Sequence, residues 1–213
     1  MNGYDKDVFA LVADKSMEQA FEGLLAQHEK LRIRQIRYGI GVHPNHDAGC
    51  RTDAVRLLRP RLNSHRYALV VFDRDGSGKE NLSREQLQKD VQKDLGRNGW
   101  GNRCKVIVID PELENWVWAP SGKVSEILGW GSDFHALRQW LQAHELWSVK
   151  DLKPSDPKRA MEEATRRKKV KRSATLFKRI ADISQPQHCQ DPAFIELRET
   201  LQDWFSADSR IRN

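Results

Sequence analysis

The chain has 213 residues, of which 38% are hydrophobic and 31% are charged, and its formal net charge is +6. This composition is typical of a globular protein in water, and no apolar run is long enough to span a membrane. The three cysteines are widely spaced and form neither a C-x-x-C pair nor a disulfide framework. Together with an N-terminus that lacks a signal-peptide core, they predict a cytoplasmic protein without membrane contact.

The first half of the chain alternates between strand and helix patterns. Val8–Val12 is a short apolar run, and Ser16–Gln19 matches a capping box that opens a helix. Ile33–Val42 has the partial alternation of a strand. The segment His43–Cys50 is expected to be a loop, and Asp53–Leu62 a helix.

Tyr67–Phe72 is an unbroken apolar run that suits a strand buried on both faces of a parallel sheet. A second capping box at Ser83–Gln86 predicts the next helix. Lys105–Ile109 is a further buried strand. Pro111 suits the first position of a helix capped by Asp110, and this short helix is expected to run through Asn115–Ala119.

From Ser132 onward the pattern is helical only, with four amphipathic helices. Strands that alternate with helices indicate parallel β-α units. The sequence therefore predicts an α/β fold with a mostly parallel sheet of four or five strands flanked by helices. Residues 1–131 are expected to form the α/β domain, and residues 132–213 a basic helical C-terminal region packed on it.

Asp73 and Asp75 follow the central apolar run and are two residues apart. On a strand they point the same way, so both carboxylates face one point at the sheet edge where open α/β sheets bind ligands. Such a pair is stabilised by a cation, and oxygen ligands favour Mg²⁺ or Mn²⁺. Ordinary turn residues, or neutralisation by Arg74, are the alternatives. A calcium loop is excluded because Arg84 occupies the position of its essential glutamate.

Two other segments carry candidate ligands. Zinc-competent side chains lie between His43 and Cys50, where zinc, a functional loop and a solvated loop are all compatible with the sequence. Lys158–Arg179 holds ten Lys or Arg and two Glu, so it carries +8 and the rest of the chain about −2. Its basic run predicts a phosphate-binding surface, with a solvated helix face as the alternative. That run comprises Arg166, Arg167, Lys168, Lys169, Lys171 and Arg172.

Three blocks in this order, VADKSMEQA, ALVVFDRDGSG and VIVIDPELENWVWA, resemble the TOPRIM fold of topoisomerases, primases and OLD-type nucleases. More narrowly, they resemble the small TOPRIM-like proteins of bacterial methylation-associated defence systems. The similarity covers most of the chain and includes the C-terminal segment DPAF–LRETLQDWF.

The resemblance assigns roles to individual residues. It implies that Asp73 and Asp75 hold Mg²⁺, with Glu112 and Glu114 completing the metal and catalytic site. For the two glutamates the alternative is a favourable interaction with a helix dipole. TOPRIM enzymes end their first strand with Glu-Gly, whereas this chain has Ala13-Asp14. The resemblance then leaves the missing glutamate's role to Asp14 or to Glu18. Lys15 is either a phosphate contact or a solvated turn residue.

The resemblance implies a bacterial antiviral defence component that cleaves nucleic-acid phosphodiesters with Mg²⁺ or Mn²⁺. Its expected partners are nucleic acid, with DNA favoured, and other defence-system proteins, and a dimer is one alternative for the oligomeric state. A non-catalytic adaptor or sensor in a defence complex is the second hypothesis, supported by the altered first-strand motif. A phosphohydrolase acting on a small nucleotide is the third.

Overall fold

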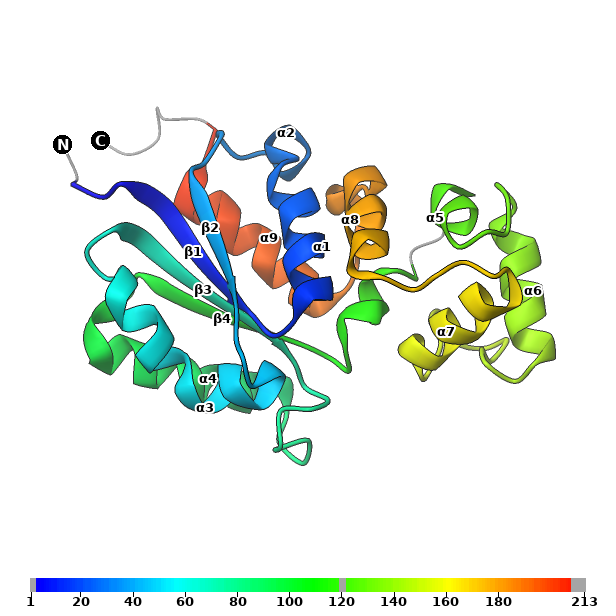
Figure 1. Cartoon of the computed structure of the whole chain (residues 1–213), viewed down its shortest axis with the longest axis horizontal. Coiled ribbons are helices and arrows are strands. Elements are labelled where there is room, and N and C mark those ends of the chain that lie inside the picture. The colour runs from blue at the N-terminus through cyan, green and yellow to red at the C-terminus, as the bar shows by residue number, and fades with distance from the viewer. Residues whose placement is uncertain (1–2, 119–121, 208–213) are drawn as a thin grey trace.

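A computed structural model describes residues 3–118 and 122–207. Its sheet has four strands, all parallel to their neighbours, in the order β2-β1-β3-β4 (Figure 1). The strands are β1 (Lys6–Val12), β2 (Tyr38–Val42), β3 (His65–Asp73) and β4 (Cys104–Ile109). The predicted α/β class, with a parallel sheet flanked by helices and a helical C-terminal part, is confirmed.

The central strand β3 is buried on both faces, as its sequence predicts: Ala68 through Phe72 have no exposed surface. Helices α3 (His46–Leu58) and α4 (Arg84–Leu95) cover one face of the sheet, and α1 (Lys15–Leu25) and α9 (Pro192–Phe205) cover the other (Figure 1). Helix α2 (His28–Leu31) follows α1, and α8 (Ala174–Ile183) packs along α1.

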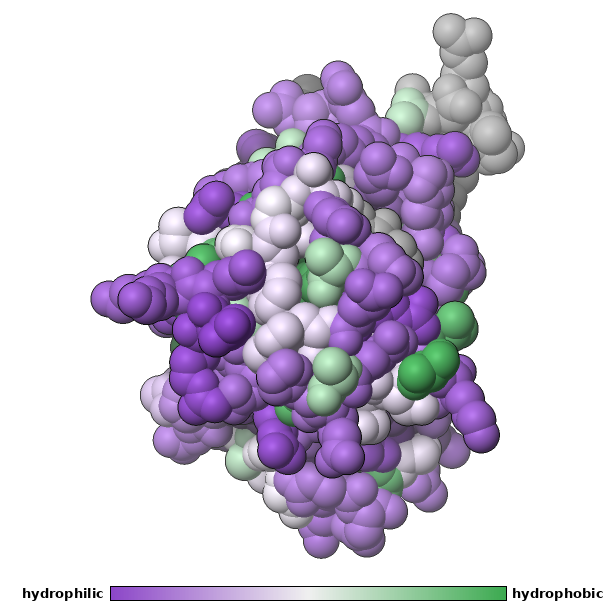
Figure 2. All heavy atoms as spheres, turned by 90° about the vertical axis from the view of Figure 1, so that its right-hand side faces the viewer, coloured by the Kyte–Doolittle hydropathy of each residue, from purple (hydrophilic) through white to green (hydrophobic). Residues whose placement is uncertain are grey.

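Three helices form a lobe beyond the C-terminal ends of the strands: α5 (Gly122–Ile127), α6 (Phe134–Ala143) and α7 (Pro157–Arg167) (Figure 1). Helix α5 packs against both α6 and α8. Figure 2 shows that the outer face of the lobe is mostly hydrophilic. The chain leaves the sheet after β4, builds this lobe, and returns to the sheet with α8 and α9. No helix among the described residues is long and apolar enough to cross a membrane.

The strand predicted at Ile33–Val42 is shorter than expected, because β2 begins at Tyr38. The preceding residues pair with the end of α9 instead: Ile33 forms an isolated antiparallel bridge with Ser206, and the amide of Arg34 donates to the carbonyl of Phe205, 2.9 Å away. An alternating pattern of apolar residues does not show whether a segment pairs within the sheet or with another part of the chain.

Two predicted helix starts are wrong. Helix α1 is capped by Asp14, whose Oδ1 accepts a hydrogen bond from the amide of Met17 at 2.8 Å, so Ser16 already lies in the first turn. Helix α3 begins at His46, inside the expected loop. The reason is burial: Cys50 is fully buried, and Gly49 lies against the ring of His43, where a Cβ would clash. The capping box at Ser83 is confirmed, with both of its hydrogen bonds present.

The helix predicted to start at Pro111 is also displaced. The Asp110-Pro111 peptide is cis, Glu112 is extended, and a single 3₁₀ turn follows over Leu113–Trp116. Hydrogen bonds to the loop after β3 keep the segment extended, since the amide of Asp75 donates to the carbonyl of Pro111 at 3.1 Å. The end of the predicted helix, Ala119, lies outside the described residues.

Candidate functional site

A polar cavity of about 580 Å³ opens at the C-terminal edge of the sheet, between the strand ends and helix α7. It therefore lies at the edge where ligands bind in open α/β sheets. Seven acidic residues line it: Asp14, Asp47, Asp73, Asp75, Glu112, Glu114 and Asp156. Two cations, Lys158 and Arg172, also line it.

Asp73 is the last residue of β3 and lines the cavity. Its Oδ1 atom is buried and has no hydrogen-bond partner among the described residues. Burial raises the pKa of Asp73 well above its ordinary value, and the nearby carboxylates of Asp47 and Glu114 raise it further. A buried acceptor oxygen without a donor is unfavourable unless a proton or a cation reaches it.

From the sequence, Asp47 was named only among the zinc-competent side chains of the segment His43–Cys50, and not as a member of the carboxylate cluster. It lies in the first turn of α3, and its Oδ1 accepts a hydrogen bond from the amide of Asp73 at 2.8 Å. Burial raises its pKa, and Asp14 adds to this effect. Gly76 makes the approach feasible, because its φ of 85° turns the chain so tightly that a Cβ there would lie 3.3 Å from Asp47 Oδ2. The only sequence signal was the alternative of a functional loop near the site.

The predicted pair Asp73 and Asp75 does line one cavity, but the two residues differ in environment. Asp75 is exposed, whereas Oδ1 of Asp73 is buried. Arg74 lies 3.3 Å from Asp110 and is paired with that residue, not with the Asp-x-Asp carboxylates. Arg74 therefore does not neutralise the pair formed by Asp73 and Asp75.

Glu112 and Glu114 line the same cavity, and both are paired with cations from the C-terminal half of the chain. Glu112 Oε1 accepts a hydrogen bond from the amide of Lys158 at 3.0 Å, and the Lys158 ammonium lies 3.7 Å from Oε2. Burial, reinforced by Glu114, raises the pKa of Glu112 to about 7. Glu114 is only 4% exposed and pairs with Arg172.

Of the residues predicted after β1, only Asp14 reaches the cavity. Its carboxylate also caps α1. Lys15 and Glu18 form an ion pair with each other at 2.7 Å, and neither lines the cavity. Of the two acids that could replace the missing first-strand glutamate, Asp14 and Glu18, only Asp14 therefore lines the cavity.

The predicted basic run divides into two groups. Three of its members are engaged: Arg166 pairs with Glu163, Lys168 lies 4.3 Å from the centre of the Trp130 ring, and Arg172 contacts Glu114 and, at 3.6 Å, Glu162. The other three are exposed and have no side-chain partner in the described part of the chain. They are Arg167, Lys169 and Lys171.

The segment from His43 to Cys50 does not form a zinc centre. His43 is completely buried, and its Nδ1 accepts a hydrogen bond from the amide of Asn45 at 3.0 Å. Cys50 is buried too. Across residues 3–118 and 122–207, no group of three or more His, Cys, Asp or Glu side chains is arranged to hold a metal ion. The predicted Mg²⁺ or Mn²⁺ site accordingly stays a prediction.

The cavity nevertheless brings together carboxylates, a group whose pKa is near neutral, and two cations, all of which are compatible with phosphate chemistry. Its acidic wall offers carboxylate oxygens only, the donors that Mg²⁺ and Mn²⁺ prefer. Glu112 has a pKa close to neutrality, which suits a group that exchanges protons. Lys158 and Arg172 are cations that can contact a phosphate in the same cavity. Comparison of the chain with protein-family models, curated proteins and solved structures found no match.

Proposed function

We propose that this protein is a divalent-metal-dependent phosphodiesterase acting on nucleic acid, with its active site in the acidic cavity. The single observation that carries the proposal is the buried Oδ1 of Asp73, which has no donor among the described residues and lies among other carboxylates at the edge where parallel sheets bind ligands. An ionised Asp73 among other carboxylates does not stabilise the fold, whereas a bound cation would neutralise the carboxylates and coordinate the unpaired oxygen.

The residues fit Mg²⁺ or Mn²⁺ by their chemistry. Mg²⁺ is commonly held by one or two carboxylates together with water and substrate phosphates, so a complete protein cage is not required. Asp73 and Asp75 would hold the ion, with Asp47 and Asp14 as further oxygen donors in the cavity. A bound ion would polarise the phosphate and promote ionisation of a water nucleophile.

The chain's own residues account for the remaining tasks. Glu112, whose pKa is about 7, is able to accept or donate a proton near neutral pH. Arg172 and Lys158 would bind the scissile phosphate, and to do so each must exchange its glutamate partner for the substrate. The resemblance noted from the sequence extends the proposal to a role in bacterial antiviral defence.

A first experiment measures Mn²⁺ and Mg²⁺ binding by calorimetry in the wild type and in Asp73→Ala/Asp75→Ala, with Asp90→Ala as an exposed control. A second incubates duplex DNA, single-stranded DNA and RNA with protein and metal. The proposal predicts metal-dependent cleavage that the double variant loses while it stays folded. Absence of metal binding at millimolar concentration, with or without nucleic acid, would reject it.

Two alternatives rest on specific observations. The cavity of about 580 Å³ is within the range of small-molecule pockets, which favours hydrolysis of a small nucleotide as a second candidate. The pairing of Glu112 and Glu114 with cations favours a non-catalytic adaptor. An enzyme for small nucleotides would hydrolyse them with metal yet leave DNA and RNA intact. An adaptor would be indifferent to Asp73→Ala.

A further inference from the structure

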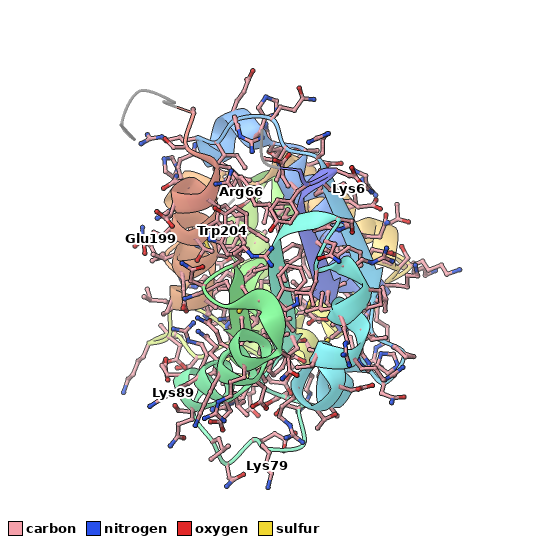
Figure 3. All side chains as sticks on the ribbon, turned by 90° about the vertical axis from the view of Figure 1, so that its left-hand side faces the viewer. Lys6, Arg66, Lys79, Lys89, Glu199 and Trp204 are labelled. Atoms are coloured by element: carbon pink, nitrogen blue, oxygen red, sulfur yellow. The ribbon has the colours of Figure 1, made fainter. Side chains whose placement is uncertain are left out.

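The end of the sheet opposite the acidic cavity is rich in cations. Lys6 begins β1, Arg66 lies at the start of β3, Arg61 precedes that strand, and Arg103 directly precedes β4. Because the N-terminal ends of parallel strands share one edge, these side chains lie together. Figure 3 views this end, with Lys6 and Arg66 on neighbouring strands and Trp204 of α9 beside Arg66. We call Lys6, Arg61, Arg66 and Arg103 the basic edge.

The contacts place these residues around one point, His65. Lys6 is the register partner of His65 across β1 and β3. Arg103 Nη1 donates hydrogen bonds to the carbonyls of His65, at 3.3 Å, and Arg66, at 2.9 Å. Burial lowers the pKa of His65, and the charges of Lys6 and Arg61 lower it further, which requires both cations to be near.

Two of the arginines are held in place by aromatic rings. The Arg66 guanidinium lies 5.2 Å from the centre of the Tyr67 ring, which stacks on Trp204 with centroids 4.4 Å apart. The Arg61 guanidinium lies 4.9 Å from the centre of the Phe9 ring. Within the described residues, neither makes an ion pair or a side-chain hydrogen bond. Their N–H donors are therefore oriented and available at little entropic cost.

Nearby acids do not neutralise the basic edge. Asp7 is engaged by Arg34 at 2.6 Å and by Arg37 at 3.9 Å. Asp5 is close enough to raise the pKa of His65, but it is exposed and forms no ion pair among the described residues. Residues 166–172 differ, because Arg166 and Arg172 are held in ion pairs there, whereas no member of the basic edge forms an ion pair among the described residues.

We propose that the basic edge is a second polyanion-binding surface, which takes the phosphate backbone of double-stranded nucleic acid. Planar guanidinium groups match phosphate oxygens, and several cations along one edge suit a regularly spaced row of phosphates. A membrane fits less well, since the exposed large apolar residues of the described chain, Val149 and Leu152, lie between α6 and α7. Backbone binding needs no metal and does not depend on the proposed cleavage.

The test is fluorescence anisotropy with a labelled DNA duplex of about 20 base pairs, in EDTA and over a series of salt concentrations. The variant is Lys6→Gln/Arg61→Gln/Arg66→Gln. Its matched control, Lys79→Gln/Lys89→Gln/Lys123→Gln, loses the same charge from exposed positions in the loop after β3, on α4 and on α5, away from the basic edge. The variant should bind about tenfold or more weakly, with a salt slope lower by about 2 to 3, and the control within about twofold of wild type.

Arg66 packs on Tyr67, so its removal risks disturbing the fold. Lys6→Gln/Arg61→Gln changes only exposed side chains and should still weaken binding about threefold or more. The proposal is overturned if this folded variant binds like wild type, or if wild-type protein binds anionic vesicles but not the duplex. It is also overturned if Arg167→Gln/Lys169→Gln/Lys171→Gln alone abolishes binding. Because EDTA removes the metal, the binding measurement does not depend on whether the protein cleaves nucleic acid.

Discussion

The backbone amide of Asp73 donates a hydrogen bond to Oδ1 of Asp47, 2.8 Å away, and thereby joins the end of β3 to the first turn of α3. This bond holds a second carboxylate beside the buried side chain of Asp73. The Asp47 carboxylate raises the pKa of Asp73, and burial raises the pKa of both acids. The arrangement works against stability.

Replacing Asp73 with asparagine should therefore stabilise the protein. Because the folded state raises the pKa of Asp73, ionisation at neutral pH costs free energy that an amide avoids. We expect the free energy of unfolding at pH 7 to rise by about 1 to 2 kcal/mol in Asp73→Asn, measured by urea denaturation, while metal binding is lost. Asp90→Asn, on the exposed face of α4, should change stability by less than about 0.5 kcal/mol. A destabilised Asp73→Asn would show that the carboxylate has a structural role.

The pair formed by Arg172 and Glu114 should show strong coupling. Glu114 is nearly buried, so Arg172→Gln leaves its charge without a partner beside Asp73. We expect a loss of roughly 1 to 3 kcal/mol in the free energy of unfolding. The double variant Arg172→Gln/Glu114→Gln should recover most of that loss in a double-mutant cycle. Additive effects of the two substitutions would mean that the ion pair does not form in solution.

The sequence predicts the fold better than it predicts the site. Apolar runs such as Tyr67–Phe72 and local signals such as the Ser83 capping box depend on neighbouring residues, and both are confirmed. The failures at Ile33 and Pro111 have a common cause. Each segment is held by hydrogen bonds to a distant part of the chain, respectively the end of α9 and the loop after β3.

For the site, the strand-end rule correctly brings Asp14, Asp73 and the acids after β4 to one cavity. Asp47 was not placed in the carboxylate cluster because α3 begins at His46, seven residues before the helix start expected at Asp53. Arg172 was placed in an open phosphate-binding surface, and only the path of the chain from α7 to α8 brings it over Glu114. Lys15 and Glu18 pair with each other locally, as their i,i+3 spacing at the start of α1 allows.

Asp191 connects the segment after β4 with the start of α9. Its carboxylate accepts hydrogen bonds from Asn115 at 2.7 Å and from the Trp116 indole at 3.0 Å, and it also caps α9. Since Asp191 is 5% exposed, Asp191→Ala leaves several buried donors without an acceptor. We expect a loss of about 2 to 4 kcal/mol in the free energy of unfolding.

The control for this variant is Asp133→Ala, because Asp133 caps α6 from an exposed position and has only the backbone donors of that helix. Loss of an exposed cap costs about 1 kcal/mol. Equal losses in the two variants would mean that the bonds of Asp191 to Asn115, Trp116 and Lys153 contribute nothing beyond capping. Urea denaturation followed by circular dichroism measures both.

The buried histidines His43 and His65 should make the protein less stable in mild acid. Burial lowers the pKa of each below its ordinary value of 6.5. As the pH falls through 6.5, the unfolded chain binds a proton that the folded protein resists, so the free energy of unfolding decreases. Each histidine should therefore contribute a loss of about 1 kcal/mol between pH 7.5 and 5.5.

Carboxylates with a raised pKa, such as Glu112, act in the opposite sense over the same range, because the folded protein binds their protons first. The histidine contribution is therefore measured by comparing how the free energy of unfolding changes with pH in each variant and in wild type. In His43→Gln and in His65→Gln, the change in the free energy of unfolding between pH 7.5 and 5.5 should be less unfavourable than in wild type by about 1 kcal/mol. His135→Gln, at an exposed position on α6, should keep the wild-type slope. If the two buried-site variants also keep it, these histidines take up protons in the folded protein as readily as in the unfolded chain.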